Sequence, residues 1–323
     1  MSKIARDGRM PTGDEILLGE NLELLRSFAS ASFQMIYIDP PFNRGGDRSR
    51  KTLEASARAD GERVGFGGRR YRATVLRESS YGDEFEDYLG FLRPRLEQAR
   101  RVLAREGTLY FHIDYREAHY CKLLLDEIFG RDAFLNELIW SYDYGAKPRR
   151  RWPAKHDTIL VYVRTQGAHH FDADAVEREP YMAPGLVGAE KAARGKLPTD
   201  VWWHTIVPTH GGEKTGYPTQ KPEGIVRRMV LASTRPGDWC LDFFAGSGTL
   251  GAVASKLRRR YVLIDRNPEA VAIMRERLAQ GEPVTPHRAG DRGGKRAAAS
   301  VRPARRGDAV ALSRARGARD SGR

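Results

Sequence analysis

The chain has 323 residues, of which 40% are hydrophobic, and a formal net charge of +13. This length allows one large α/β domain with insertions or two domains, and the charge favours a polyanionic partner, nucleic acid before an anionic membrane. No stretch approaches the ~20 apolar residues of a membrane span, and the first residues lack the apolar core of a secretory signal. Cys121 and Cys240 lie in apolar segments without metal-ligand spacing, which is typical of buried free thiols in a reducing cytoplasm.

The first half of the chain alternates predicted strands and helices. Apolar residues at helical spacing indicate the helices, and short apolar runs bounded by turn residues indicate the strands. In chain order these are a strand and a helix over 16–26 with a turn at Gly19, a strand over 34–38, a helix over 86–103, a strand over 108–113 after a break at Gly107, a helix over 116–129 stopped by Gly130, and strands over 136–142 and 157–163. Residues 44–80 are polar, rich in Arg and Gly and without clear periodicity, which predicts a long loop.

The second half begins with a change in amino-acid composition over residues 164–216. Gly, His, Pro and acidic clusters alternate there, which predicts a small inserted module anchored by Trp202 and Trp203. The predicted elements that follow are a helix to about residue 234, a strand ending at Asp242, a helix over 249–258, a strand over 261–264 ending at Asp265, and a helix over 268–279. The tail, 281–323, has 11 basic and 4 acidic residues, and this net +7 without apolar periodicity predicts a disordered segment that either is simply solvated or binds polyanions non-specifically.

A glycine-rich loop over residues 246–251, Gly-Ser-Gly-Thr-Leu-Gly, lies between a predicted strand and a predicted helix. It matches the dinucleotide pattern, and Asp265 ends the next strand, where a carboxylate can accept bonds from two ribose hydroxyls. An NAD domain would need several more strand–helix units after Asp265, but one helix and a tail remain. Asp242 and Phe243-Phe244 place a carboxylate and aromatic rings at the loop entrance, which suits a methionine moiety with a sulfonium. We therefore expect an adenosyl cofactor.

A second loop, Asp39-Pro40-Pro41-Phe42-Asn43, follows the apolar run 35–38. An exocyclic amine of a base is a poor nucleophile because its lone pair is delocalised, and acceptors for both of its N–H groups draw it towards a pyramidal geometry. Asp39 supplies a carboxylate, Pro40 a carbonyl, Pro41 a fixed φ, and Phe42 a face for a flipped-out base. The loop offers no nucleophile for attack at C6 of cytosine, which cytosine-C5 transfer needs.

These two loops resemble the DNA amino-methyltransferases. Residues 39–42 look like motif IV of that family, residues 244–248 like motif I, Asp265 like the acidic residue of motif II, and residues 217–222 like motif X. Motif IV precedes motif I, which is the order of the β class, and segments 37–43 and 124–140 also resemble modification subunits of type III restriction systems. The resemblance implies methylation of an amino nitrogen of DNA with S-adenosylmethionine as the cofactor.

The residues at motif IV bear on the choice of base. Asp39 stands where cytosine-N4 enzymes often carry Ser, which favours adenine N6, and Phe42 replaces the commoner Tyr while keeping the stacking face. Cytosine N4 remains the alternative within the class. A catalytically silent DNA-binding relative is a second alternative, against which the intact motif residues argue. A methyltransferase for RNA or protein amides is a third, disfavoured because the protein-glutamine enzymes usually carry Asn at the position of Asp39.

The fold implied is α/β, a circularly permuted Rossmann-like methyltransferase fold with a mostly parallel sheet, an antiparallel edge hairpin and a small inserted target-recognition module. Its expected parts are a catalytic half over 15–163 with the variable loop 44–80, the module over 164–216, a cofactor-binding half over 217–280 and the tail. The expected cofactor-binding residues are Lys221, Asp242, Phe244, Gly246, Ser247, Gly248, Thr249 and Asp265. Lys221 is expected to contact either the methionine end of the cofactor or the adjacent loop.

The turn of the edge hairpin is expected to contact DNA phosphates through its basic side chains, which are Lys147, Arg149, Arg150 and Arg151. His112 and Asp114 lie at the end of a strand, and a structural role is favoured for both. The expected partner is duplex DNA, with no metal and no membrane, in the cytoplasm at the nucleoid. A homodimer and a restriction partner stay open, the latter because the chain is shorter than typical type III subunits.

Overall fold

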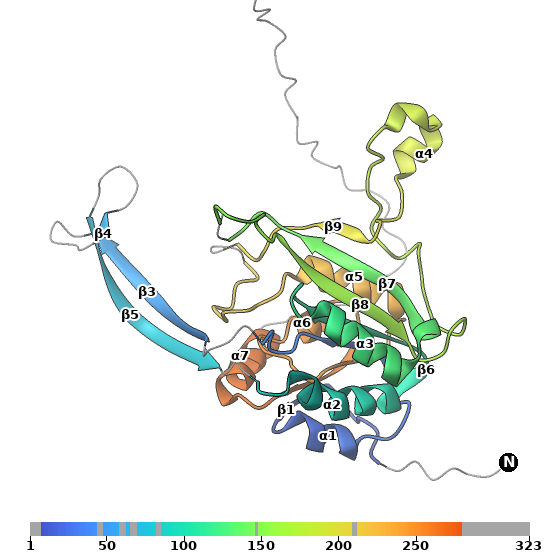
Figure 1. Cartoon of the computed structure of the whole chain (residues 1–323), viewed down its shortest axis with the longest axis horizontal. Helices are drawn as coiled ribbons and strands as arrows, with labels where there is room; N and C mark the ends of the chain where they lie inside the picture. The colour runs from blue at the N-terminus through green and yellow to red at the C-terminus, as the bar shows by residue number, and fades with distance from the viewer. Residues whose placement is uncertain are drawn as a thin grey trace, which may run out of the picture. The chain divides into compact units, whose positions relative to one another are not determined.

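A computed structural model describes residues 8–43, 48–57, 63–64, 70–81, 85–145, 148–208 and 212–279. Its centre is an eight-stranded sheet in the order β1-β11-β10-β2-β6-β8-β7-β9 (Figure 1). The strands are β1 (Glu15–Leu18), β11 (Arg260–Asp265), β10 (Trp239–Asp242), β2 (Phe33–Ile38), β6 (Leu103–Ile113), β8 (His156–Val163), β7 (Phe134–Ser141) and β9 (Val201–Trp203). Neighbouring strands of this sheet pair in parallel except at β8, which is antiparallel to both β6 and β7.

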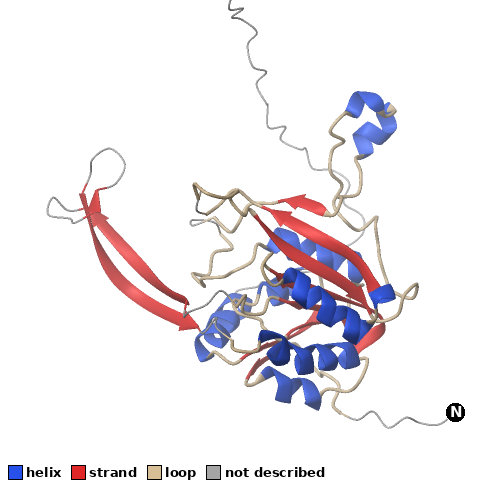
Figure 2. Ribbon diagram, in the orientation of Figure 1, coloured by secondary structure: helices blue, strands red, loops and turns tan. Residues whose placement is uncertain are grey.

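Helices cover both faces of the sheet (Figure 2). One face carries α1 (Asn21–Ser27), α2 (Tyr88–Val102) and α3 (Ala118–Phe129), and the other carries α5 (Glu223–Ser233), α6 (Thr249–Lys256) and α7 (Pro268–Ala279). Successive side chains of a strand point to opposite faces, so in β2 Ile36 and Ile38 pack under α1 and α2 while Met35 and Tyr37 pack towards α5. The apolar run at 35–38 therefore reflects a strand buried on both faces, as parallel strands usually are.

Local signals explain where several elements begin and end. The Asp87 carboxylate accepts a hydrogen bond from the Gly90 amide at 2.8 Å and caps the start of α2. Gly130, with φ of 94°, ends α3 as predicted. Gly107 does not break the chain before β6, which was the expectation. It lies inside the strand, where the register against β2 shifts between Phe33 and Met35, a place where glycine is common.

The expected edge hairpin is not at an edge. Strands β7 and β8 do pair antiparallel, but Val201–Trp203 from the segment 164–216 joins the sheet as β9 beside β7. Trp202 is buried in the core against α5, as an anchor should be, whereas the side chain of Trp203 is largely exposed. A three-residue strand has too little periodicity to be found in the sequence. The same segment also holds the short helix α4 (Ala189–Arg194).

The expected long loop over residues 44–80 contains a separate three-stranded antiparallel sheet. Its order is β3 (Arg48–Ala57), β5 (Arg70–Tyr81) and β4 (Arg63–Val64). The sheet is built by main-chain pairing, which requires no apolar alternation. Its charged sequence therefore gave no pattern from which strands could be predicted. The tail 281–323 and Lys147 lie outside the described residues.

The parallel strands end at one edge of the central sheet, and the predicted site loops lie there. Asp39 directly follows β2, while Asp242 ends β10 and Asp265 ends β11. Because β10 lies between β11 and β2, the sheet order places these carboxylates on neighbouring strands. None of the described helices has the length and apolar character needed to cross a membrane.

Candidate active site

A cavity of about 360 Å³ opens at this edge and joins the two loops. All four predicted catalytic residues, Asp39 to Phe42, lie on its wall. The predicted cofactor residues on the wall are Lys221, Asp242, Phe244, Gly246, Ser247, Thr249 and Asp265. Gly248 is not on the wall; it has φ of 72° and starts α6, and a Cβ there would come within 2.8 Å of Met274. Two segments about 200 residues apart in sequence therefore form one site.

The Asp39 carboxylate divides its two oxygens between different environments. Its Oδ2 accepts a hydrogen bond from the Lys221 ammonium group. Its Oδ1 is buried and accepts no hydrogen bond from any residue that the structure describes, and His112 Nδ1 lies 4.0 Å away. A buried acceptor without a donor is costly in a folded protein, so this oxygen marks a place where a ligand N–H fits.

The loop that carries Asp39 is held rigidly. The Tyr88 hydroxyl donates to the Pro41 carbonyl at 2.6 Å. Asn43 has φ of 51°, and its side chain accepts from the Phe85 amide at 3.2 Å and donates to Glu117 at 3.0 Å. Asparagine tolerates this left-handed conformation better than most residues, which explains its place directly after Phe42.

Phe42 lies beside the ion pair. The Lys221 Nζ atom is 4.9 Å from the centre of its ring, and the His112 ring centre is 5.9 Å from it on a tilted plane. The ring is thus fixed by neighbours and also forms part of the cavity wall. Its stacking role for a flipped base stays a prediction.

In the glycine-rich loop, carboxylates bind main-chain amides. The two oxygens of Asp265 accept from the amides of Gly246 and Asn267, both at 2.8 Å, and Asp242 accepts from the Phe244 amide at 2.9 Å. Gly246 has φ of 50°, and a Cβ there would lie 3.0 Å from the Tyr217 ring. The predicted glycine requirement therefore has a direct cause in the turn and in the packing of Tyr217.

Burial perturbs both carboxylates of this loop. It raises the pKa of Asp242 well above its usual value, and the nearby carboxylates of Asp39 and Asp265 add to that effect. Burial also raises the pKa of Asp265, although the amide bonds from Asn267 and Gly246 oppose it. One buried and one partly buried acid beside an open cavity are typical of a site that binds a charged or polar ligand.

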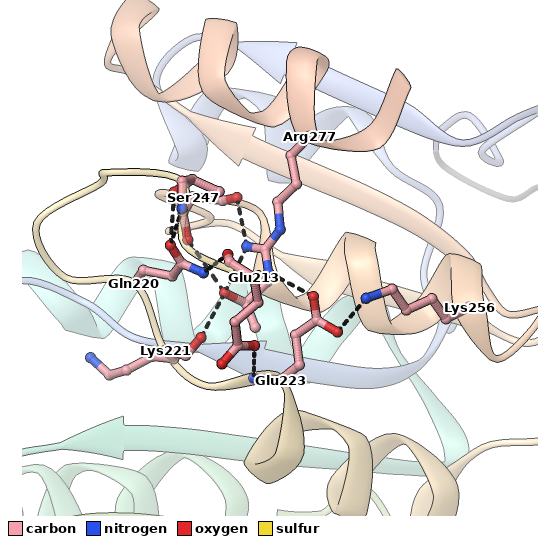
Figure 3. Close-up of polar contacts among 9 residues, drawn as sticks. Glu213, Gln220, Lys221, Glu223, Ser247, Lys256 and Arg277 are labelled. Carbon is pink, nitrogen blue, oxygen red and sulfur yellow. Dashed lines mark hydrogen bonds and ion pairs between the residues drawn. The ribbon is translucent and has the colours of Figure 1, made fainter. Parts of the chain in front are cut away.

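The segment carrying Lys221 is bonded to the glycine-rich loop (Figure 3). The Thr249 hydroxyl donates to the Lys221 carbonyl at 3.1 Å. Arg277, on α7, donates to the Ser247 carbonyl at 3.2 Å and to Glu223 at 2.9 Å. Lys221 therefore connects the two loops, since its main chain contacts the glycine-rich loop and its side chain contacts Asp39. The side chain of Lys221 contacts the Asp39 loop, and its predicted contact with the methionine end of the cofactor stays a prediction.

Further hydrogen bonds fix the same segment. The other Glu223 oxygen accepts from Lys256 at 2.6 Å, and the Glu223 amide donates to Glu213 at 3.0 Å (Figure 3). Burial alone would raise the pKa of Glu223, but the hydrogen bonds from Lys256 and Arg277 hold it below its usual value. Gln220 donates to the Glu213 carbonyl at 2.5 Å. Charged side chains on α5, α6 and α7 thus fix the position of the first turn of α5.

A chain of polar groups near Asp39 was not expected from the sequence, although its member His112 was named there with a structural role favoured. The Tyr37 hydroxyl lies 2.9 Å from His112 Nδ1, His112 Nε2 lies 3.3 Å from an oxygen of Asp157, and Tyr142 donates to the other oxygen of Asp157 at 3.1 Å. These residues come from β2, β6, β8 and the end of β7, so no motif could have revealed them. Tyr37, Tyr142 and Asp157 line the cavity, while Asp114 binds Arg116 and does not.

The predicted DNA-contacting arginines, Arg149, Arg150 and Arg151, are exposed on the connection between β7 and β8. Strand β7 runs in the same direction as the parallel strands, so this connection leaves from the edge that holds the cavity. Lys155 donates to the main-chain carbonyls of Tyr144 at 2.7 Å and Gly145 at 2.9 Å. These bonds join the two ends of the connection between β7 and β8. The phosphate contacts themselves stay a prediction.

Neither cysteine reaches the cavity. Cys121 and Cys240 are fully buried, and burial raises the pKa of Cys121 strongly and that of Cys240 to about 12. A buried thiol with such a pKa supplies little thiolate for attack on a base. Within the described residues, no group of three or more His, Cys, Asp or Glu side chains is arranged to hold a metal ion.

Comparison with known proteins assigns the chain to a family. A family model described as DNA methylase, of the N6/N4 methyltransferase type, matches residues 33–276. The chain belongs to the N6/N4 DNA methylase family. The match runs from the start of β2 into α7, so it includes both loops of the site. The predicted resemblance is confirmed, and the protein is a DNA methyltransferase.

Curated relatives have similar lengths. The Type II methyltransferase M.HpaI of Haemophilus parainfluenzae is 30% identical over 266 residues, which cover 82% of this chain and 74% of that protein. The DNA adenine methyltransferase YhdJ of Escherichia coli strain K12 is 29% identical over 286 residues, which cover 84% and 87%. The predicted likeness to type III modification subunits stays a prediction.

Solved structures confirm the methyltransferase fold. The PvuII DNA methyltransferase, which is cytosine-N4-specific, superposes with a TM-score of 0.56 at 15% identity, covering 84% of this chain and 89% of that chain. A DNA modification methylase of Thermus thermophilus, TTHA0409, solved in complex with S-adenosyl-L-methionine, gives 0.51 at 19% identity, covering 82% and 93%. The mostly parallel sheet with helices on both faces agrees with this fold. Circular permutation stays an interpretation of the motif order.

Proposed function

We propose that this DNA methyltransferase transfers a methyl group from S-adenosylmethionine to N6 of an adenine in duplex DNA. The observation that carries the proposal is the Asp39 carboxylate. One of its oxygens is bonded to Lys221, and the other is buried, without a donor among the described residues, beside a cavity shared with the glycine-rich loop. An amino N–H of a base is the group that this second oxygen fits.

The residues of the glycine-rich loop fit the methyl donor. S-adenosylmethionine supplies an electrophilic methyl group on a sulfonium and carries a ribose, an amino group and a carboxylate. We expect Asp265 to bind the ribose, because its oxygens keep lone pairs beyond the two amide bonds. Asp242, buried on the cavity wall, is suited to a cationic group, and Phe244 offers an aromatic surface there. Gly246 lets the main chain approach the ligand closely.

The Asp39 loop acts on the amine. The carboxylate of Asp39 and the carbonyl of Pro40 would accept hydrogen bonds from the two N–H groups, which concentrates the lone pair on nitrogen for attack. After transfer the nitrogen carries an extra proton, and Asp39 is placed to accept it. Acceptors held in a fixed geometry contribute mostly in the transition state, where charge develops on the amine. Phe42 would support the face of the flipped-out base.

Two observations favour adenine over cytosine. The carboxylate of Asp39 stands where cytosine-N4 enzymes often have a hydroxyl, and a relative that is 29% identical bears the name of an adenine methyltransferase. Likeness to the cytosine-N4-specific PvuII enzyme at 15% identity concerns the fold alone. In this proposal the segment 164–216, which contributes Ile206, Val207 and Lys214 to the cavity, helps to read the target sequence. The site of action is the nucleoid.

The test is identification of the methylated base. The purified protein is incubated with unmethylated duplex DNA and S-adenosylmethionine carrying a labelled methyl group, and the nucleosides are then separated by mass spectrometry. We expect labelled N6-methyladenine. Labelled N4-methylcytosine would overturn the choice of base, 5-methylcytosine would overturn the mechanism, and the absence of any label would indicate a silent relative. Single-molecule sequencing of the product DNA then gives the recognised sequence.

A further inference from the structure

We propose that His112, oriented by Asp157, is a positioning residue. It accepts the hydrogen bond of the Tyr37 hydroxyl and so keeps Asp39 Oδ1 available for the target amine. This inference rests on the proposed function, because it concerns the same carboxylate. Its starting point is a contrast between two acceptors. His112 Nδ1 has a partner, the Tyr37 hydroxyl at 2.9 Å, whereas Asp39 Oδ1, only 4.0 Å from the same nitrogen, has none among the described residues.

The contacts of His112 determine which of its nitrogens carries the proton. The Asp157 carboxylate can only accept, and it already receives the Tyr142 hydroxyl at 3.1 Å. Its other oxygen lies 3.3 Å from His112 Nε2, so Nε2 carries the hydrogen and donates. In the neutral ring Nδ1 is then a bare acceptor. It receives the Tyr37 hydroxyl and has no hydrogen to offer to Asp39.

Tyr37 is the donor that would otherwise compete for Asp39. It is almost fully buried and lines the same cavity. Burial raises the pKa of Tyr37 well above 10, and the nearby carboxylates of Asp39, Asp242 and Asp157 raise it further, so the hydroxyl keeps its proton and needs an acceptor. Without His112 Nδ1, Asp39 Oδ1 is a nearby acceptor whose lone pairs no donor uses among the described residues. A bond from Tyr37 to that oxygen would occupy the position that the amine requires.

The environment of His112 is consistent with this positioning role. The side chain is fully buried, and the rings of Trp140 at 5.7 Å and Phe42 at 5.9 Å between centres confine it. A buried polar chain with imperfect bonds is costly compared with an apolar core, and such chains are retained where they specify one arrangement. The strands that supply it, β2, β6 and β8, are adjacent in the sheet.

The test is a double-variant cycle. His112→Phe keeps a ring but removes the acceptor, and we expect kcat to fall by about tenfold or more with little change in KM for S-adenosylmethionine. Tyr37→Phe in the His112→Phe background removes the competing hydroxyl, and we expect it to raise kcat by about fivefold or more over His112→Phe alone. A purely structural role predicts that the double variant is as slow as His112→Phe or slower, and that result would overturn the inference.

Two further measurements complete the design. Tyr110 lies beside Tyr37 in the pairing register, is also buried, and bonds to Ser233 at 2.7 Å away from the cavity, so Tyr110→Phe is the matched loss of a buried hydroxyl and should not rescue His112→Phe. Nitrogen-15 spectra of the wild-type protein report the tautomer directly, even if a variant fails to fold. An unprotonated Nδ1 supports the inference, and a hydrogen on Nδ1 contradicts it. Failure of the proposed function looks different, because the wild-type protein would then form no N6-methyladenine.

Discussion

At the residue scale, Asp39 carries the acceptor on which the proposed transfer depends. We predict that Asp39→Ala lowers turnover by about 10²-fold or more, because the lost acceptor acts mainly in the transition state. Affinity for S-adenosylmethionine, measured by calorimetry, should stay within about threefold, since the amides and carboxylates of the glycine-rich loop remain. Asp132, exposed in the connection before β7, provides the matched control as Asp132→Ala. Turnover of Asp39→Ala close to wild type would remove Asp39 from the mechanism.

At Asp242, the buried carboxylate lowers the stability of the fold at neutral pH but is expected to help bind S-adenosylmethionine. Its pKa is raised in the folded protein, mainly by burial, above the ordinary value of 3.8. The folded state therefore holds this proton more tightly than the unfolded state does. The resulting stabilisation is complete below pH 3.8 and is lost as the pH rises through the folded pKa.

We predict that Asp242→Asn raises the free energy of unfolding at neutral pH by about 1–3 kcal/mol, since an amide keeps the bond from the Phe244 amide without a buried charge. Urea unfolding followed from pH 4 upwards should show a flatter pH dependence for the variant than for wild type. Calorimetry should show weaker binding of S-adenosylmethionine to the same variant. An unchanged pH dependence would mean that Asp242 is not the group responsible.

At the scale of elements, α7 holds the glycine-rich loop and the start of α5 together through Arg277. We predict that Arg277→Met raises KM for S-adenosylmethionine by about tenfold, because the Ser247 carbonyl and Thr249 lose their donor. Unfolding should become easier by about 2–4 kcal/mol, since Glu223 loses one of its two cationic partners. Arg275, exposed on the same helix, gives the control Arg275→Met. Equal effects of both changes would point to helix propensity instead of the network.

The element scale also explains the position of Lys221. It directly precedes Pro222, which caps α5, and its carbonyl accepts the Thr249 hydroxyl at the start of α6. The helices α5 and α6, on one face of the sheet, therefore determine the position of the Lys221 ammonium group, which donates a hydrogen bond to Asp39. Changes in the network of α5, α6 and α7 are expected to affect the Asp39 loop through this residue.

At the scale of the whole molecule, the net charge of +13 favours association with the DNA polyanion. We predict that replacing Arg149, Arg150 and Arg151 with Ala weakens DNA binding and lowers the slope of log affinity against log salt by about 0.9 for each phosphate that the variant no longer neutralises. The methylated sequence should not change, because the arginines are expected at phosphates. Fluorescence anisotropy over a salt series measures the slope. A change of methylated sequence with an unchanged slope would place these arginines at base edges.

The control for that experiment is an exposed arginine at the opposite edge of the sheet. Arg105 lies near the start of β6, whereas the arginine-bearing connection leaves from the end of β7. Arg105→Ala removes a positive charge from the molecule without touching the edge that holds the cavity. A similar reduction of slope per arginine in both variants would mean that net charge, and not the position of the turn, governs binding.

Sequence pattern predicted the strands of the central sheet and the helices on its two faces to within a few residues, apart from β9 and the early start of β6. It also determined both loops of the site. These features are local, since an apolar run ending in Asp39 or Asp242 and the glycines that permit positive φ act through neighbours in the chain. The alternation of strands and helices was enough to indicate a mostly parallel sheet.

Other features depend on strand order and main-chain pairing, which are established only when the chain folds. The contact of Lys221 with Asp39, the bonds of Arg277, and the Tyr37–His112–Asp157 chain each join residues from separate elements, and no spacing in the sequence encodes them. Strand β9 and the sheet over residues 48–81 form by backbone hydrogen bonds, which leave no apolar pattern. Sequence pattern records which side chains are buried, whereas the orientation of a buried polar group is set by the partners that folding brings to it.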